Sequence, residues 1–302
     1  MTSDSSNKNI LITGASGLIG SALQEYLTGA GYRVFALERH GGNGPFVFDQ
    51  DNERMDLDAS IPLAAVINLA GAGIADGRWT EKRKQEIWDS RIRTTTLLCE
   101  ALAQLPHKPE VLISASAIGF YGKQCRQPAD EESPAGDDFL ANLSVAWEQA
   151  ADAATQSGIR TVKLRFGLVL SDKGGVLENL VLPLKLAVVG RLGDGTHLQS
   201  WIGLADALSI ISGCIENRNF SGPLNAVAPE VVTNREFARS LSKALSRPQL
   251  PPLPAAVVRV MFGEMADAAL LASANINSKR IAELGVSLQH PALGEALQAI
   301  YS

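Results

Sequence analysis

Cysteine is scarce in this chain of 302 residues, which contains only three. Cys99, Cys125 and Cys214 lie far apart, form no C-x-x-C pair and are odd in number. Their spacing excludes a disulfide framework and a cysteine-based zinc site, and it predicts buried thiols in a reducing compartment. The four histidines also lack the spacing of metal ligands, so we expect no metal site.

Long apolar runs and an excess of positive charge are missing as well. Residues 1–9 are polar and contain no apolar signal core, and Glu178 and Lys185 interrupt the most apolar stretch. The formal net charge of -5 counts against nucleic acid or an anionic membrane as a partner. We therefore expect a cytoplasmic protein that acts on a small molecule, with no nucleic-acid and no membrane partner. Its oligomeric state is left open.

The pattern that is present is typical of an α/β enzyme. With 46% hydrophobic and 20% charged residues, the chain can bury a large core. Strand-like apolar runs occupy residues 9–13, 33–37, 65–69, 111–115 and 161–165. Helical patterns occupy residues 81–89, 93–104, 139–156 and, after the cap Thr233, 234–246. This alternation predicts a Rossmann-type, doubly wound parallel sheet covered on both faces. We assign residues 8–172, with 200–228 returning, to a dinucleotide-binding domain, and residues 173–199 and 229–302 to a smaller substrate lobe.

The most informative motif is T-G-A-S-G-L-I-G at residues 13–20, directly after the first apolar run. Gly14 allows a tight turn, Gly17 removes the Cβ that would keep backbone from phosphate, and Gly20 lets the next helix pack closely. The helix N-terminus then offers free N–H groups and a partial positive charge to a diphosphate. A turn that merely needs glycine is the alternative. The preceding strand and the amphipathic pattern of residues 21–27 favour a dinucleotide cradle.

Glu38 and Arg39 follow the second strand, where residue type separates the two nicotinamide cofactors. An acid there accepts from the ribose 2′-OH of NAD, whereas an arginine accommodates the 2′-phosphate of NADP. A carboxylate beside a phosphate is repulsive unless it points away. We favour NADP(H), contacted by Arg39 with help from His40, and keep NAD(H) as the runner-up. The alternative for Arg39 is a solvated surface charge.

Two further apolar runs end in small residues that let a flat ligand approach the backbone, V-I-N-L-A-G-A-G at 66–73 and S-A-S-A-I-G-F-Y-G at 114–122. With the glycine loop, they resemble the extended short-chain dehydrogenase/reductase superfamily. Further matching motifs follow in order, R-W-T at 78–80, W-E at 147–148, R-F-G-L-V-L at 165–170 and N-R-E-F-A at 234–238. The chain thus resembles an atypical branch, the epimerase family proteins with a C-terminal domain of unknown function.

This resemblance implies a Rossmann fold that binds NADPH. The contacts it implies are Gly14, Ser16, Gly17, Leu18, Ile19, Gly20, Arg39, Leu69, Ala70, Gly71, Glu86, Arg91 and Val169. The fork of Arg91 suits a phosphate or a ribose. Glu86 would accept from a ribose hydroxyl or hold Arg91, and an ion pair on the helix surface is equally compatible with the spacing.

The chemistry of the superfamily usually needs a Ser or Thr, a Tyr, and a Lys four residues after the Tyr. The lysine lowers the pKa of the phenol, which exchanges a proton while hydride moves. Ser116 falls in the serine position, but alignment on Glu148 places Leu140 and Ser144 where the Tyr and Lys are expected. The usual pair is therefore absent. Tyr121 is the nearby phenol and a substitute catalytic candidate beside Ser116, although a packed aromatic is the favoured alternative.

Two classes of function follow from these motifs. The first is an NADP(H)-dependent oxidoreductase or epimerase acting on a small polar or sugar-nucleotide-like substrate, which the glycine loop and Ser116 favour. The second is a regulatory protein that binds NADP(H) with little or no catalysis, which the missing Tyr-Lys pair favours. Relatives of this branch have been linked to cell division, which suits the second class.

Overall fold

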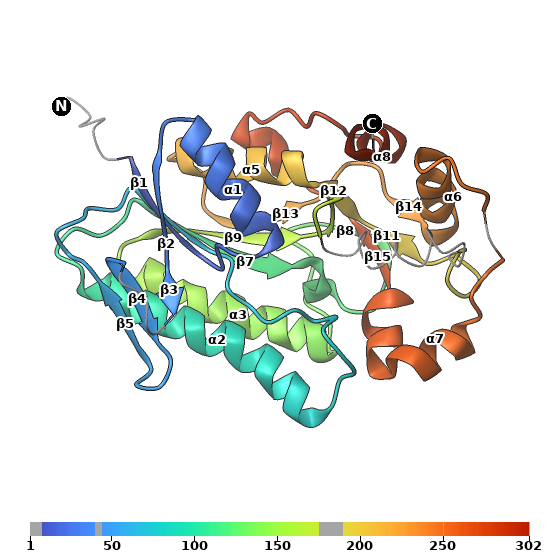
Figure 1. Cartoon of the computed structure of the whole chain (residues 1–302), viewed down its shortest axis with the longest axis horizontal. Helices are drawn as coiled ribbons and strands as arrows, with labels where there is room; N and C mark the ends of the chain where they lie inside the picture. Colours follow the sequence, from blue (N-terminus) through green and yellow to red (C-terminus); the bar gives the residue numbers. More distant parts are fainter. Residues whose placement is uncertain (1–7, 40–43, 175–189, 250, 302) are drawn as a thin grey trace.

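The computed structural model describes residues 8–39, 44–174, 190–249 and 251–301. His40, Glu178 and Lys185 lie outside these ranges, as does most of the segment 173–199. A central sheet runs through the described part, with helices above and below it and a group of shorter elements at one end (Figure 1).

Six parallel strands form the central sheet, in the order β13-β9-β7-β6-β1-β2. Their bounds are Asn9–Thr13 (β1), Arg33–Ala36 (β2), Ala65–Asn68 (β6), Val111–Ala117 (β7), Arg160–Phe166 (β9) and Gly222–Ala226 (β13). Since β1 lies between β2 and β6, the winding reverses there, and doubly wound sheets bind ligands at this point. Ile10, Leu11 and Ile12 are all fully buried, as expected of a parallel sheet covered on both faces. The predicted Rossmann-type fold is confirmed.

Helices cover both faces of this sheet (Figure 1). Helices α1 (Leu18–Gly29) and α5 (Leu204–Glu216) lie on one face, and α2 (Glu81–Gln104) and α3 (Phe139–Gln156) on the other. The prediction of separate helices at 81–89 and 93–104 is wrong, because α2 is one continuous helix of 24 residues. Nothing between the two stretches breaks a helix: Ser90 donates from its Oγ to the Ile87 carbonyl within the helix.

Short strands and helices complete the described chain. The pairs are β3 (Glu38–Arg39) with β4 (Phe46–Asp49), β4 with β5 (Arg54–Leu57), β8 (Gln124–Ala129) with β15 (Ser273–Ile276), β10 (Leu168–Leu170) with β12 (Trp201–Gly203), and β11 (Leu198–Gln199) with β14 (Val232–Thr233). The later helices are α6 (Asn234–Ala244), α7 (Ala255–Phe262) and α8 (Leu293–Tyr301). As predicted, Thr233 caps α6, in a capping box with Glu236. The boundaries of the two lobes stay a prediction.

The three cysteines are free thiols. Cys99 and Cys214 are buried, and burial raises the pKa of Cys99 to about 11 and that of Cys214 to about 12. Within the described ranges, no helix is long and apolar enough to cross a membrane. The same residues contain no group of three or more His, Cys, Asp or Glu side chains arranged to hold a metal ion.

Candidate active site

The glycine loop joins β1 to α1, and its glycines have different structural roles. Gly14 has a φ of +67°, and a Cβ there would lie 2.6 Å from the carbonyl oxygen of Leu69. A Cβ on Gly20 would lie 2.3 Å from the carbonyl oxygen of Gly14. Gly17 is different, because it is exposed and a Cβ on it would meet only that same oxygen, at 3.3 Å. Gly14 and Gly20 are therefore needed for the loop itself, whereas Gly17 keeps the loop open toward solvent.

The start of α1 fits the diphosphate of a dinucleotide. Gly17 is the N-cap residue and supplies no side-chain cap, and the first turn carries no acidic residue. The first donation back into the helix comes from Ser21 to the Gly17 carbonyl, at 2.9 Å. The amides of residues 18–20 have no intrahelical acceptor, so these amides and the helix dipole are available to an anion. Ser16 is exposed at the same loop.

Glu38 and Arg39, the two charged residues that follow β2, have different surroundings. Glu38 Oε2 accepts a hydrogen bond from the amide of Gly44 at 3.2 Å, so this carboxylate is engaged by the following loop. Arg39, the next residue of β3, is exposed, and no hydrogen bond or ion pair of its side chain is found in the described ranges. Successive strand residues point to opposite faces. The carboxylate that would repel a 2′-phosphate is thus held by the backbone, while the guanidinium of Arg39 has no partner among the described residues.

A strip of backbone after β6 connects the glycine loop to the partly buried Arg91. A Cβ on Gly14 would touch both the Leu69 carbonyl and, at 3.0 Å, the Ala70 amide nitrogen. Two residues later, a Cβ on Gly71 would lie 3.0 Å from the guanidinium carbon of Arg91. Small residues therefore let the glycine loop, residues 69–71 and the part of α2 that carries Arg91 approach each other closely along the carboxyl edge of the sheet.

Arg91 is a partly buried cation with no carboxylate paired to it among the described residues. Its Nη1 donates to the Ile87 carbonyl at 3.1 Å, and its Cζ lies 5.2 Å from the ring centroid of Trp147. Burial, with a smaller effect of Arg83, lowers the pKa of Arg91 to about 10. Its remaining N–H donors suit a phosphate or ribose oxygen. Glu86 does not hold Arg91: this exposed carboxylate pairs with Arg83 at 3.0 Å.

A pocket of about 390 Å³ opens at the carboxyl ends of β7 and β9, and both Arg91 and Ser116 line it. Its walls are mostly apolar and include Leu140, Leu143, Trp147, Phe166, Ala268 and Ala269. The two alanines belong to a π-helical turn, Ala266–Leu270, that follows α7. Val169 lies in β10, where its side chain packs against the main core.

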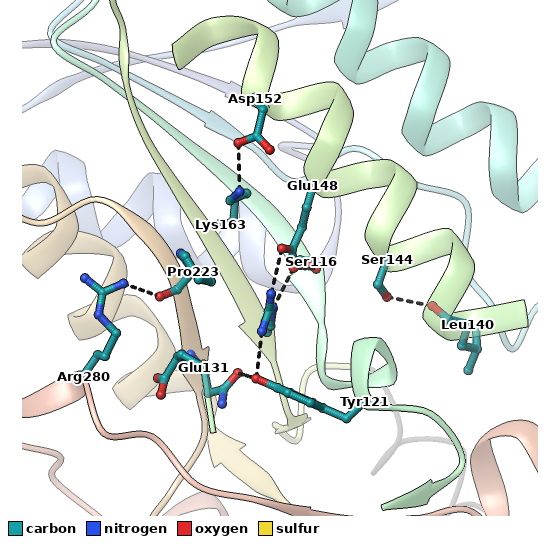
Figure 2. A network of polar contacts seen from close by, with 12 residues as sticks. Ser116, Tyr121, Glu131, Leu140, Ser144, Glu148, Asp152, Lys163, Pro223 and Arg280 are labelled. Carbon is teal, nitrogen blue, oxygen red and sulfur yellow. Dashed lines mark hydrogen bonds and ion pairs between the residues drawn. The ribbon is translucent and has the colours of Figure 1, made fainter. Parts of the chain in front are cut away.

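Ser116 belongs to a buried polar network that joins three elements (Figure 2). Its Oγ, at the end of β7, donates to Glu148 Oε1 of α3 at 2.8 Å. Arg165 of β9 donates from Nε to the same oxygen at 2.7 Å and from Nη2 to Oε2 at 2.9 Å. Only 8% of the Glu148 side chain and 4% of the Arg165 side chain are exposed. The roles of this pair were not predicted, although an arginine in an apolar strand signals a buried anion nearby.

Tyr121 lies at the other end of this network (Figure 2) and does not line the pocket. Its hydroxyl accepts from Arg165 Nη1 and donates to Asn225 Oδ1, both at 2.8 Å. Burial raises the pKa of the phenol, against the opposing effect of Arg165. Both its hydrogen and a lone pair are engaged within the protein, which favours a structural role over proton transfer.

The positions that the alignment predicts for the Tyr and the Lys lie on the pocket wall. A Cβ on Gly119 would lie 3.2 Å from the Cβ of Leu140, so this leucine packs directly on the loop after β7. Ser144 donates from Oγ to the Leu140 carbonyl at 2.8 Å (Figure 2). Both residues line the pocket. Neither can provide the phenol or the ammonium group of the usual chemistry.

Comparisons with known proteins agree with this geometry. Residues 10–225 match the NAD dependent epimerase/dehydratase family, and residues 253–300 match a domain of unknown function, DUF1731. The epimerase family protein SDR39U1 of Homo sapiens is 36% identical, over 96% of this chain and 99% of its own. The epimerase family protein Mb2239 of Mycobacterium bovis is 38% identical, over 96% and 97%. The crystal structure of human SDR39U1 with NADPH has a TM-score of 0.87 at 34% identity, covering 97% of this chain and 99% of that one. The UDP-glucose 4-epimerase of Thermus thermophilus in complex with NAD shares the fold, with a TM-score of 0.76 at 19% identity over 97% of each chain.

Proposed function

Because this chain belongs to the NAD dependent epimerase/dehydratase family, we propose that it binds NADP(H) and acts as an oxidoreductase or epimerase on a small substrate. The observation that carries the proposal is the continuous path from the glycine loop, past residues 69–71, to Arg91 and the pocket beside Ser116. The likeness to human SDR39U1, whose structure contains NADPH, supports it. We keep a cytoplasmic location and a small-molecule partner as part of this proposal.

Each part of the path has its own role in holding the cofactor. The amides at the start of α1 bind the diphosphate, Arg39 binds the 2′-phosphate, and Arg91 binds a phosphate or ribose oxygen. The engagement of Glu38 by Gly44 favours NADP(H) over NAD(H), because it removes a carboxylate from the phosphate. When bound, the cofactor supplies hydride transfer.

The pocket holds the substrate in this proposal, and Ser116 is the catalytic residue that contacts it. Tyr121, the other candidate from the sequence, already bonds with Arg165 and Asn225. Its hydrogen bonds support a structural role, so we expect Tyr121→Phe to affect stability more than the chemical step.

One observation favours a second candidate function, a regulatory protein that binds NADP(H) with little or no turnover. Leu140 and Ser144 occupy the pocket wall where proton transfer is expected, and no tyrosine is found among the described residues that line the pocket. Binding of the cofactor would then stabilise the fold without a reaction.

Two measurements on the purified chain separate these functions. The first is NADPH oxidation against a panel of carbonyl compounds and sugar nucleotides, and the second is thermal melting with NADPH or NADH. A cofactor at a hundredfold excess over its Kd stabilises by about 2.7 kcal/mol. Turnover supports the enzyme, and a melt that rises without turnover supports the regulatory protein. A melt that neither cofactor raises refutes both.

Arg39→Ala tests the choice of cofactor. We expect it to remove a preference for NADPH over NADH in the melt, because only the 2′-phosphate needs the guanidinium. Arg54→Ala, which removes an exposed arginine of β5, is the control and should keep the preference. Stronger stabilisation of the unmodified chain by NADH would overturn the choice.

A further inference from the structure

Ser116 lines the pocket, and the hydrogen of its hydroxyl is used within the protein. Its partner Glu148 forms an ion pair with Arg165, and the carboxylate of such a pair has only acceptor atoms. The bond of 2.8 Å between them must therefore use the hydrogen of Ser116. Since a hydrogen bond to a carboxylate is roughly twice as strong as a neutral one, an uncharged ligand competes poorly for that hydrogen.

The carboxylate of Glu148 cannot easily turn away from Ser116. Arg165 holds both of its oxygens in a fork, at 2.7 and 2.9 Å. The guanidinium is itself fixed, since its Cζ lies 3.5 Å from the ring centroid of Phe120 and its Nη1 donates to the Tyr121 hydroxyl. The direction of the Ser116 hydroxyl is thus set by a rigid, buried group.

The other serines along the pocket are arranged in the same way. Ser144 donates to the Leu140 carbonyl at 2.8 Å, and Ser200 donates to the Ala274 carbonyl at 2.9 Å. Together with Ser116, these are the three serines among the described residues that line the pocket. Each gives its hydrogen to the protein, and Ser200 Oγ also accepts from the Ile276 amide at 2.9 Å, so only the remaining lone pairs are left for a ligand.

Besides these hydroxyls, two neutral side-chain N–H groups line the pocket, and so do the cationic side chains of Arg91 and Lys123. Trp147 donates from Nε1 to the Thr95 hydroxyl at 3.0 Å, so its hydrogen is also used. Gln199 accepts from Asn234 at its Oε1, and no acceptor for its amide hydrogens is found among the described residues; it comes from β11, which is not part of the central sheet that carries Ser116. At the carboxyl end of β7, a ligand therefore meets a hydroxyl group that can accept but not donate.

We propose that the substrate binds in its alcohol form and donates its hydroxyl hydrogen to Ser116 Oγ, with Glu148 as the positioning residue that sets this polarity. A serine free to donate would favour a carbonyl oxygen instead. The apolar walls suit an alcohol on a hydrocarbon framework. The inference rests on the proposed function, since it places the substrate in the same pocket.

Saturation-transfer NMR on the full chain tests this polarity with two probes, the tertiary alcohol methylcyclohexanol and the ketone methylcyclohexanone. Both are titrated without cofactor and with NADP⁺, which can neither oxidise a tertiary alcohol nor reduce a ketone. We expect the alcohol to bind roughly fivefold tighter, the effect of one net hydrogen bond. Ser116→Ala should remove this ratio, and comparing ratios cancels the difference in ring shape.

Ser114→Ala is the matched control, because it removes a buried serine hydroxyl from the same strand outside the pocket. It should keep the ratio. Equal binding of the two probes, no binding of either, a preference for the ketone, or an unchanged ratio in Ser116→Ala would overturn the inference. A preference for the alcohol that disappears when NADP⁺ is present would also overturn the inference, because the carboxamide of the cofactor would then donate to Ser116 Oγ in place of the substrate. Failure of the proposed function appears separately, as a melt that NADPH does not raise, while the ratio without cofactor still reports on Ser116.

Discussion

Removing one member of the Glu148–Arg165 pair gives a sharp test of the buried network. In Glu148→Ala, Arg165 keeps its charge with only 4% of its side chain exposed, and it loses both carboxylate oxygens. Ser116 loses its acceptor as well. Breaking a buried pair in this way costs about 3–5 kcal/mol, because it leaves a charge without compensation.

The same two elements carry a matched control. Lys163 of β9 pairs with Asp152 of α3 (Figure 2). The two charged atoms lie 2.8 Å apart, but 43% of the Asp152 side chain is exposed. Water compensates most of this exposed pair, so Asp152→Ala should cost less than about 1 kcal/mol. Both changes remove a carboxylate that joins α3 to β9, and they differ mainly in burial.

A double variant separates charge from packing. Glu148→Ala combined with Arg165→Met removes both charges, so its loss should be smaller than that of Glu148→Ala alone. The free energy of unfolding is measured by urea denaturation followed by tryptophan fluorescence. The reasoning about the buried pair is refuted if Glu148→Ala lowers the free energy of unfolding no more than Asp152→Ala does. It is also refuted if the loss in the double variant equals the sum of the losses of the two single variants.

Two further predictions concern close packing and pH. Gly20→Ala should destabilise the fold by about 1–3 kcal/mol, because the new Cβ would lie 2.3 Å from the Gly14 carbonyl oxygen. Gly294→Ala in α8 is the control and should not destabilise the fold, because no atom lies within 4 Å of a Cβ at that position. Thermal melts of both variants check this, and equal losses would contradict it. Burial lowers the pKa of His197, so its contribution to stability is complete above the unfolded pKa of about 6.5 and is lost as pH falls below it. Between about pH 7 and about pH 5, the melting temperature of the unmodified chain should therefore drop more than that of His197→Leu. Parallel curves of melting temperature against pH for the two proteins would count against this.

The central sheet could be predicted because its strands are short apolar runs between helical patterns. Residues 9–13 form a strand with the predicted bounds, and residues 139–156 form α3 as predicted. The hairpin β4–β5 could not be predicted in the same way, because Arg54–Leu57 alternates polar with apolar residues over only four positions. The break predicted within α2 failed because a polar stretch in an amphipathic helix resembles a loop when packing is unknown.

The site could be predicted only where local sequence determines the chemistry. The glycine loop is such a case, since Gly14 and Gly20 are required by contacts within or near the loop itself. The bond from Ser116 to Glu148 spans 32 positions, and its polarity depends on Arg165 in a third element. A pattern along one chain contains no information about which distant groups share a hydrogen, so the network needed the fold.

Titration of NADPH by its fluorescence, with Gly17→Asp beside the unmodified chain, tests cofactor binding at the glycine loop. Aspartate is a favourable N-cap residue and would place a carboxylate at the start of α1, so the fold should keep its melting temperature. The same carboxylate would occupy the amides and repel a diphosphate. We expect saturable binding in the unmodified chain and none in Gly17→Asp; identical titrations of two folded proteins would contradict the proposed cofactor site.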